Sequence, residues 1–211
     1  LTQARVFMIL WMIAVLVAFL WLSSTLFGRK NALASFFLLI SFASFYANGR
    51  TVVGEIPGFL FLLVGLYFLI SRERFLLAGF FLGFSVISKL SVFGLIIPAL
   101  TLTYLFEWRR FFKVLLPVAL GMLPAGLIWI FINLDKPWLA STWSNLFQFY
   151  QNPYGSSVSQ NVVSNLLAVP SSTTLVYFGA MFLVILFGRF FVENKWKTIY
   201  NFVLIYGVLA F

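Results

Sequence analysis

Eight runs of apolar residues alternate with short polar or charged segments along the chain. The runs cover residues 6–27, 32–47, 58–70, 75–88, 90–106, 114–132, 175–191 and 199–211. A bilayer accepts apolar surface of this extent, and spanning segments in it are helices because the backbone must satisfy its own hydrogen bonds there. The pattern predicts an all-α, polytopic integral membrane protein with about seven to eight transmembrane or half-membrane helices.

Two of these runs are short for a membrane span. At about 1.5 Å per residue, residues 75–88 reach only ~21 Å and residues 58–70 only ~20 Å, against a hydrocarbon core of ~30 Å. The outer ends of such helices lie below the membrane surface, where irregular backbone is tolerated only inside protein or beside a watery cavity. We therefore expect residues 48–57 and Lys89 to line a cavity that opens to the outer side.

Lys and Arg gather in alternate connections between the runs. Ten of the 14 are Arg29, Lys30, Arg72, Arg74, Arg109, Arg110, Lys113, Arg189, Lys195 and Lys197, and the other four are Arg5, Arg50, Lys89 and Lys136. The larger set marks the cytoplasmic side by the positive-inside rule. The connections around Arg72 and Arg109 then lie on one side, so residues 75–106 must cross twice or dip in and return, with Lys89 at the outer turn.

Composition supports the same class and excludes several chemistries. A hydrophobic fraction of 63% with 9% charged residues is more than a soluble domain can bury. The net charge of +9 is scattered between apolar runs, which argues against nucleic-acid binding. The chain has no Cys and no His, so disulfides, thiolate metal sites, a cysteine nucleophile and a histidine base are excluded. Proton transfer must use Asp, Glu, Lys or Tyr.

The candidate site consists of Arg50, Glu55 and Lys89, at the ends of short apolar runs. Ionisable groups at membrane depth are costly, so they indicate a functional site. Each residue also has a structural interpretation. Glu55 precedes Pro57 at a helix start and could interact with the helix dipole, Lys89 could do so at a helix end, and Arg50 could simply neutralise Glu55.

Residues 133–174 form the largest outer segment. An i, i+3, i+4, i+7 spacing in this segment predicts an amphipathic helix, made by Trp143, Leu146, Phe147 and Tyr150. One interpretation is a helix in the membrane interface, anchored by Trp138 and Trp143. The other is a lid, or a loop that binds the acceptor, over the cavity.

Five motifs in the first half of the chain occur in a characteristic order. They are Ala4-Arg5, Leu26-Phe27-Gly28-Arg29, Arg50…Glu55-Ile56-Pro57, Ala78-Gly79…Gly83-Phe84…Ser88-Lys89, and Ile97-Pro98-Ala99-Leu100. In this order they resemble the membrane core of glycosyltransferases of the GT-C fold, in the branch of the protein O-mannosyltransferases and the lipid A aminoarabinose transferases. Ser88 departs from the more usual Thr. The resemblance covers residues 5–104, about half of the chain.

The resemblance implies transfer of a sugar from a polyprenyl-phosphate donor to a lipid, glycan or protein acceptor on the extracytoplasmic face of a prokaryotic plasma (inner) membrane. Lys89 and Arg50 would bind the donor and stabilise its departing phosphate. Glu55 matches the second acidic position, which binds donor, acceptor or a divalent metal ion, the one cofactor to consider. The main base is expected before Arg5, upstream of Leu1. We therefore expect residues 1–211 to be a single transmembrane domain from a longer protein, catalytically incomplete without its first helix and first outer loop.

Two other classes of function stay open. A transporter or flippase of a lipid-linked or small polar substrate would also place charges in a cavity, but it predicts inverted repeats or paired broken helices, and the sequence shows neither. A membrane scaffold without catalytic activity would use the charges only as helix caps. An acidic residue in an upstream outer loop would favour the transferase over both.

Overall fold

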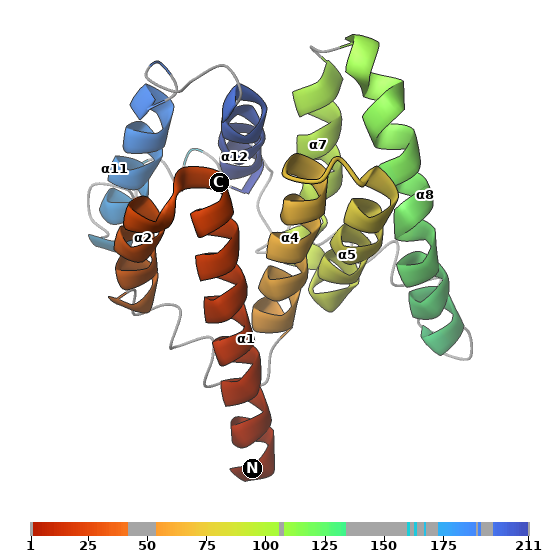
Figure 1. Ribbon diagram of the computed structural model, residues 1–211, viewed down its shortest axis with the longest axis horizontal. Helices are drawn as coiled ribbons and strands as arrows, with labels where there is room; N and C mark the ends of the chain where they lie inside the picture. The colour runs from red at the N-terminus through yellow and green to blue at the C-terminus, as the bar shows by residue number, and fades with distance from the viewer. Residues whose placement is uncertain are drawn as a thin grey trace. The chain divides into compact units, whose positions relative to one another are not determined.

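The computed structural model describes residues 2–41, 54–105, 108–133, 173–188 and 196–210, together with the single positions 160, 163, 167 and 190. Within these residues every regular element is a helix, and no strand occurs (Figure 1). The prediction of an all-α chain is therefore confirmed for the described part.

The helices follow the apolar runs closely, with corrections at three helix starts and at one interruption. They are α1 (Thr2–Phe27), α2 (Arg29–Ser41), α4 (Glu55–Ile70), α5 (Phe75–Ser88), α6 (Leu90–Phe93), α7 (Ile96–Leu105), α8 (Trp108–Asn133), α11 (Thr173–Gly188) and α12 (Lys197–Ala210). Residues 29–31, 55–57 and 108–110 were predicted to lie in polar connections, but they begin α2, α4 and α8. The predicted run 90–106 is interrupted by a turn at Gly94.

The chain divides into two compact units. The first comprises Leu1–Ile128 with Val208–Phe211, and the second comprises Trp129–Gly207. In the second unit, α11 and α12 pack closely at Gly207. A Cβ atom at this residue would lie only 3.3 Å from the ring of Phe182. The candidate site lies entirely in the first unit.

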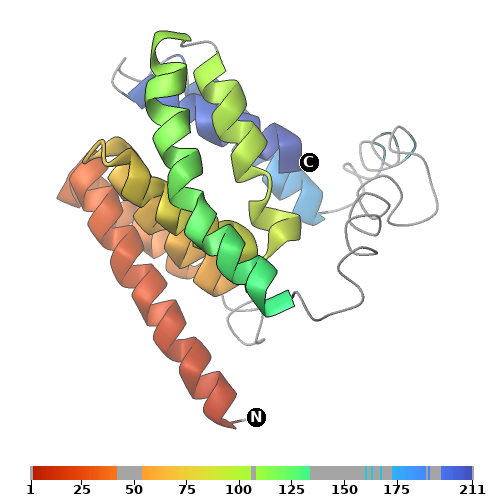
Figure 2. The same cartoon turned by 90° about the vertical axis from the view of Figure 1, so that its right-hand side faces the viewer.

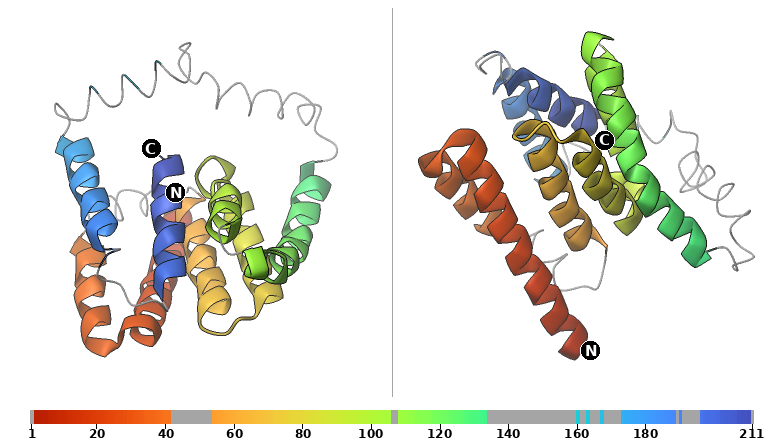
Figure 3. Two further views of the ribbon diagram at one scale, coloured as in Figure 1. Left: turned by 90° about the horizontal axis from the view of Figure 1, so that it is seen from above. Right: turned by 45° about the vertical axis from the view of Figure 1, so that its right-hand side comes forward.

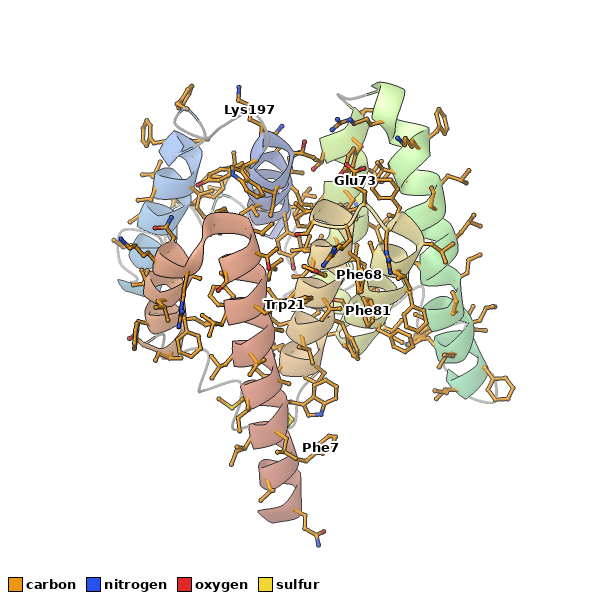
Figure 4. All side chains as sticks on the ribbon, viewed as in Figure 1. Phe7, Trp21, Phe68, Glu73, Phe81 and Lys197 are labelled. Atoms are coloured by element: carbon orange, nitrogen blue, oxygen red, sulfur yellow. The ribbon has the colours of Figure 1, made fainter. Side chains whose placement is uncertain are left out.

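Helix α4 is the centre of the first unit. It forms an antiparallel hairpin with α5, and the two helices lie side by side in every view (Figures 1 and 3). Phe68 and Phe81 stack across this hairpin with ring centroids 5.5 Å apart and an interplanar angle of 8° (Figure 4). On its other side α4 packs against α1 through the Trp21–Tyr67 ring pair, whose centroids are 3.9 Å apart.

Glycines set the distance between α5 and α8. A Cβ atom at Gly79 would lie 2.0 Å from the carbonyl oxygen of Val118, and one at Gly121 would lie 2.1 Å from the carbonyl oxygen of Leu76. A Cβ atom at Gly83 would lie 3.0 Å from both the Met122 Cα atom and the Ala125 Cβ atom. Small residues that let helix backbones approach are typical of helix pairs in membranes. The sequence expectation that Gly79 and Gly83 allow close helix packing is confirmed.

These contacts fix the directions in which α1, α4, α5 and α8 run relative to one another. Helix α1 runs parallel to α4, because Trp11 meets Phe61 and Trp21 meets Tyr67. Helix α8 runs parallel to α5 through the glycine contacts. The last turns of α1 and α4 and the first turns of α5 and α8 therefore lie at one end of the unit. We call this the basic end, because it carries Arg29, Lys30, Arg72, Arg74, Arg110 and Lys113.

Residues 75–105 leave the basic end and return to it. Helix α5 leads away from it, and the chain reverses through Lys89, α6 and the turn at Gly94. Helix α7 ends at Leu105, only three residues before α8 starts at the basic end, a reach of at most ~11 Å (Figure 2). The reversal is as the charge pattern predicts.

Among the described residues, two helices are long and apolar enough to cross a membrane. The candidate spans are Val6–Phe27 and Arg110–Ile132, of 22 and 23 residues. Only 22% and 17% of their most apolar windows are buried, whereas the core helix of a soluble protein would be mostly buried. Helices α4, α5 and α7 are apolar but shorter, and α4 at 16 residues reaches only ~24 Å. The length and exposure of the two spans favour association with a membrane.

Candidate functional site

Glu55 is the first residue of α4. Its N-cap is Gly54, which offers no side chain to the free backbone N–H groups of the first turn. A carboxylate at this position interacts favourably with the positive end of the helix dipole. Pro57 lies in the same first turn, as the sequence predicts, since the missing proline N–H has no partner to lose there. The structural interpretation of Glu55 as a helix-end charge is therefore compatible with its position.

Lys89 interrupts the chain between two helices. Its backbone is extended (φ −156°, ψ 91°), which ends α5 at Ser88. The Lys89 carbonyl oxygen then accepts hydrogen bonds from the N–H groups of Val92 and Phe93, at 3.1 and 2.9 Å, and so begins α6. The side chain consequently starts at the C-terminal end of α5, where the helix dipole favours a cation.

The structure brings Glu55 and Lys89 together as an ion pair. The Lys89 ammonium Nζ donates a hydrogen bond to Glu55 Oε1. The side chain of Lys89 is 35% exposed and that of Glu55 is 22% exposed, so the pair is half-shielded and a ligand can still reach it. The antiparallel α4–α5 hairpin explains the meeting, because it places the start of α4 beside the end of α5.

Arg50 lies outside the described residues. One interpretation of the sequence is that Arg50 neutralises Glu55. In the structure, the described partner of Glu55 is Lys89. The segment 133–174, which the sequence predicts on the outer side, lies almost wholly outside the described residues as well, including its amphipathic stretch with Trp138 and Trp143. Its two ends are helical, since α8 extends to Asn133 and α11 begins at Thr173.

Gly54 positions the pair, and the sequence reading missed it. A Cβ atom at Gly54 would lie 1.9 Å from the carbonyl oxygen of Ser88 and 3.6 Å from the Lys89 Cβ atom. Any side chain at residue 54 would therefore push the start of α4 away from Lys89. The available signal was a glycine directly before the only acid of the region.

A second contact holds the same end of the hairpin. The buried Ser85 hydroxyl donates a hydrogen bond of 2.8 Å to the Gly58 carbonyl oxygen. The absence of a side chain at Gly58 also makes room for the ring of Phe93, since a Cβ atom on Gly58 would lie 2.2 Å from that ring. The aromatic ring of α6 thus packs on the first turns of α4, and this contact fixes where the chain reverses after Lys89.

The pair offers two chemical functions. An ammonium that is partly desolvated can bind a phosphate oxygen, and a carboxylate can orient a hydroxyl or take part in binding a metal. In the described part of the chain, no three residues among His, Cys, Asp and Glu lie close enough to hold a metal ion. A divalent ion at Glu55 would therefore need further ligands from other residues or from the substrate.

Comparisons of the chain with protein-family models, with curated proteins and with solved structures give no match. The resemblance to GT-C glycosyltransferases therefore stays a prediction that depends on the order of five motifs. Two of these motifs supply the ion pair, through Glu55 in the third and Lys89 in the fourth.

Proposed function

We propose that this chain belongs to an integral membrane glycosyltransferase, which moves a sugar from a polyprenyl-phosphate donor to a lipid, glycan or protein acceptor on the extracytoplasmic face. The observation that carries the proposal is the half-shielded Glu55–Lys89 pair at the shared end of two short apolar helices. Charges in such a place are expensive in a membrane and indicate a site by default.

Exposed apolar side chains support insertion into a membrane. Along α8, large apolar residues that no other described element covers recur every three or four positions, from Phe112 to Phe131, which is 77% exposed. Helix α1 is similar, with exposed residues such as Val17 along its length and Phe7 near its start (Phe7 in Figure 4). Continuous apolar surface of this extent is unusual on a soluble monomer and is what a lipid environment requires.

The position of the pair supports an extracytoplasmic site. Glu55 and Lys89 lie at the end of the α4–α5 hairpin opposite to the basic end. By the positive-inside rule the basic end faces the cytoplasm, so the pair faces the other side. Nucleotide sugars are cytoplasmic, and a transferase that works on the outer side must take its sugar from a lipid-carried donor.

The proposed reaction is a displacement at the anomeric carbon. The acceptor hydroxyl oxygen forms the new bond to that carbon, the bond from carbon to phosphate oxygen breaks, and the phosphate leaves with the electron pair. The hydroxyl proton passes to a carboxylate base, which the resemblance assigns to an acid other than Glu55. Charge grows on the phosphate during this step, so a positioned cation such as Lys89 stabilises the transition state more than the ground state.

The ion pair adds a step before the reaction. In the structure the Lys89 ammonium is bound to Glu55, so a donor phosphate must compete with that carboxylate for it. Once the phosphate has displaced it, Glu55 is free to bind the acceptor hydroxyl or a metal ion. The pair therefore predicts that the donor binds before the acceptor.

The test is sugar transfer by the full-length protein in detergent, with polyprenyl-phosphate mannose and polyprenyl-phosphate aminoarabinose as separate donors. We expect Lys89→Met to lower kcat by a factor of about 100 to 1,000, as for the loss of one donor that stabilises an anionic transition state. The donor KM should change less, because the interaction strengthens as the bond breaks. Lys197→Met removes a lysine from α12 and should leave transfer unchanged.

The double variant Lys89→Met with Glu55→Gln separates chemistry from capping. If the pair only stabilises the fold, removing both charges restores thermal stability and transfer together. If Lys89 binds phosphate, stability recovers and transfer stays low. Parent-like transfer by a stable Lys89→Met protein would overturn the proposal. Movement of the lipid donor across vesicles without any transfer would instead assign the chain to the flippases.

A further inference from the structure

The basic end is a strongly charged surface that the proposed sugar transfer does not use. All six of its basic side chains are exposed. They come from three places in the chain, which are the start of α2 with Arg29 and Lys30, the α4–α5 connection with Arg72 and Arg74, and the start of α8 with Arg110 and Lys113. Glu73 is the acid that the structure describes among them, and Figure 4 shows it at this end of the α4–α5 hairpin.

Helix ends do not offset this positive charge, because α1, α4 and α7 end here, α2, α5 and α8 begin here, and their dipoles largely cancel. Helices α2, α5 and α8 begin at this end, and none has an acidic residue in its first turn. Basic side chains occupy these starts instead, although a helix N-terminus is itself positive and is stabilised by anions. With the helix dipoles balanced, the six exposed cations leave this surface positive, and an external anion would stabilise it.

One of these cations is already oriented. The Nε–H group of Arg72 donates a hydrogen bond of 2.8 Å to the hydroxyl of Tyr67, and the guanidinium lies over the same ring at 5.7 Å from its centroid. Tyr67 is buried and packs on Trp21, so its hydroxyl is a fixed anchor. The guanidinium keeps its remaining N–H donors for an oxyanion, and less entropy is lost when one binds.

Apolar surface borders the charge on several sides. Exposed large apolar side chains lie within two or three turns of the cations, on four helices, and include Trp21, Phe37, Leu76 and Leu116. A nucleic acid or a soluble acidic protein would leave these side chains in water. A phospholipid matches both parts, because its phosphate meets the cations and its acyl chains cover the apolar faces.

We propose that the basic end is a binding surface for the headgroups of anionic phospholipids. The inference rests on the proposed insertion into a membrane and is independent of sugar transfer. Basic side chains near an anionic membrane surface each contribute on the order of 1 kcal/mol, so three of them correspond to an affinity change of about a hundredfold.

The experiment compares phosphatidylglycerol with phosphatidylcholine. The protein is purified in an uncharged detergent, each lipid is titrated in, and the thermal unfolding midpoint reports binding. We expect phosphatidylglycerol to raise the midpoint at lower concentrations than phosphatidylcholine does, and added salt to reduce the difference. The triple variant Arg29→Gln, Arg72→Gln and Arg74→Gln should bind phosphatidylglycerol on the order of a hundredfold more weakly.

A matched triple variant keeps the charge and changes only the side-chain shape. Arg29→Lys, Arg72→Lys and Arg74→Lys should retain most of the preference, which controls for damage to the fold. Equal stabilisation by both lipids in the parent protein would overturn the inference. So would an equal effect of inorganic phosphate, since the surface would then be a site for a free anion. Co-flotation with phosphatidylcholine vesicles reports insertion separately, so loss of the lipid preference alone leaves membrane insertion intact.

Discussion

The two ends of the α4–α5 hairpin use charge in opposite ways. At one end a single lysine meets a single glutamate, both half-shielded and each at the helix terminus that its charge favours. At the other end six basic side chains are exposed at a surface where three helices begin and three end, so the helix dipoles do not offset their charge. The first arrangement is neutral and internally compensated, whereas the second calls for anions from outside the chain.

Magnitudes show what each arrangement contributes to the fold. A partly exposed ion pair is worth about 0–1 kcal/mol, and a charge at a favourable helix end adds about 0.3–1 kcal/mol. Neither is enough to fix the start of α4 against the end of α5. The backbone contact between Gly54 and Ser88 and the buried Ser85–Gly58 hydrogen bond fix it instead. The ion pair is therefore available for a ligand to open without unfolding this end.

The largest expected effect concerns which side of the membrane each end faces. The chain has no cysteine, so single cysteines can be introduced without background. Cysteines at Asn31 and Glu73, both exposed at the basic end, should stay unlabelled by an impermeant maleimide in intact cells. Cysteines at Thr51 and Ser157 should be labelled completely, because the sequence predicts them on the outer side.

Lysed cells provide the control for this experiment, since all four cysteines should react once the membrane is opened. The reverse pattern in intact cells, with the cysteines at positions 31 and 73 labelled, would reverse the membrane orientation and place the basic end outside. It would also place the Glu55–Lys89 pair on the cytoplasmic side and remove the argument for a lipid-carried sugar donor.

A smaller effect is expected when the backbone contact at the paired end is disturbed. The new methyl group in Gly54→Ala would lie 1.9 Å from the Ser88 carbonyl oxygen, so the start of α4 must shift. Overpacking of this kind costs about 1–3 kcal/mol. We expect a lower thermal unfolding midpoint, and also a lower kcat for sugar transfer, because Glu55 and Lys89 move apart.

Gly126→Ala is the matched control for that substitution. Gly126 lies inside α8, and a Cβ atom there has no heavy atom within 4 Å. The substitution should be neutral or stabilise by up to ~1 kcal/mol, because alanine favours a helix. If Gly54→Ala behaves like Gly126→Ala in both stability and transfer, the close contact at Gly54 does not position the pair.

Hydropathy and charge predicted most of the fold. The run 75–88 coincides with α5 at both ends, the interruption at Lys89 is present, and Gly79 and Gly83 pack as expected. Most of the errors fall at helix starts, and the exception is the turn at Gly94 inside the predicted run 90–106. Residues 29–31 and 55–57 are polar and were taken for connections, yet a first helical turn tolerates polar residues because its N–H groups have no partner within the helix.

The site was predicted less completely than the fold. The sequence selected Glu55 and Lys89 separately, from the cost of charge among apolar residues. It did not pair them with each other, because a pairing across 34 residues depends on the register of the hairpin. That register is set by Gly54, Gly58 and Ser85, through a close approach of backbones and a buried hydrogen bond from a side chain to a backbone carbonyl, which hydropathy does not report.

The smallest expected effect is at Glu73, the acid that the structure describes at the basic end. Its φ of 49° is in the left-handed region, which costs a residue with a side chain about 1–2 kcal/mol relative to glycine. Glu73→Gly and Glu73→Ala remove the same charge and differ only in backbone freedom. Because glycine also loses more entropy on folding, by about 0.4–1 kcal/mol, we expect the glycine variant to be more stable by about 1 kcal/mol. Thermal unfolding should show this as a difference of about 2–4 °C.

Both variants should bind phosphatidylglycerol more tightly than the parent protein, since an acid has left the basic end. If the alanine variant is as stable as the glycine variant, the turn is not strained at residue 73; if neither binds more tightly, Glu73 does not weaken the basic end as an anion surface.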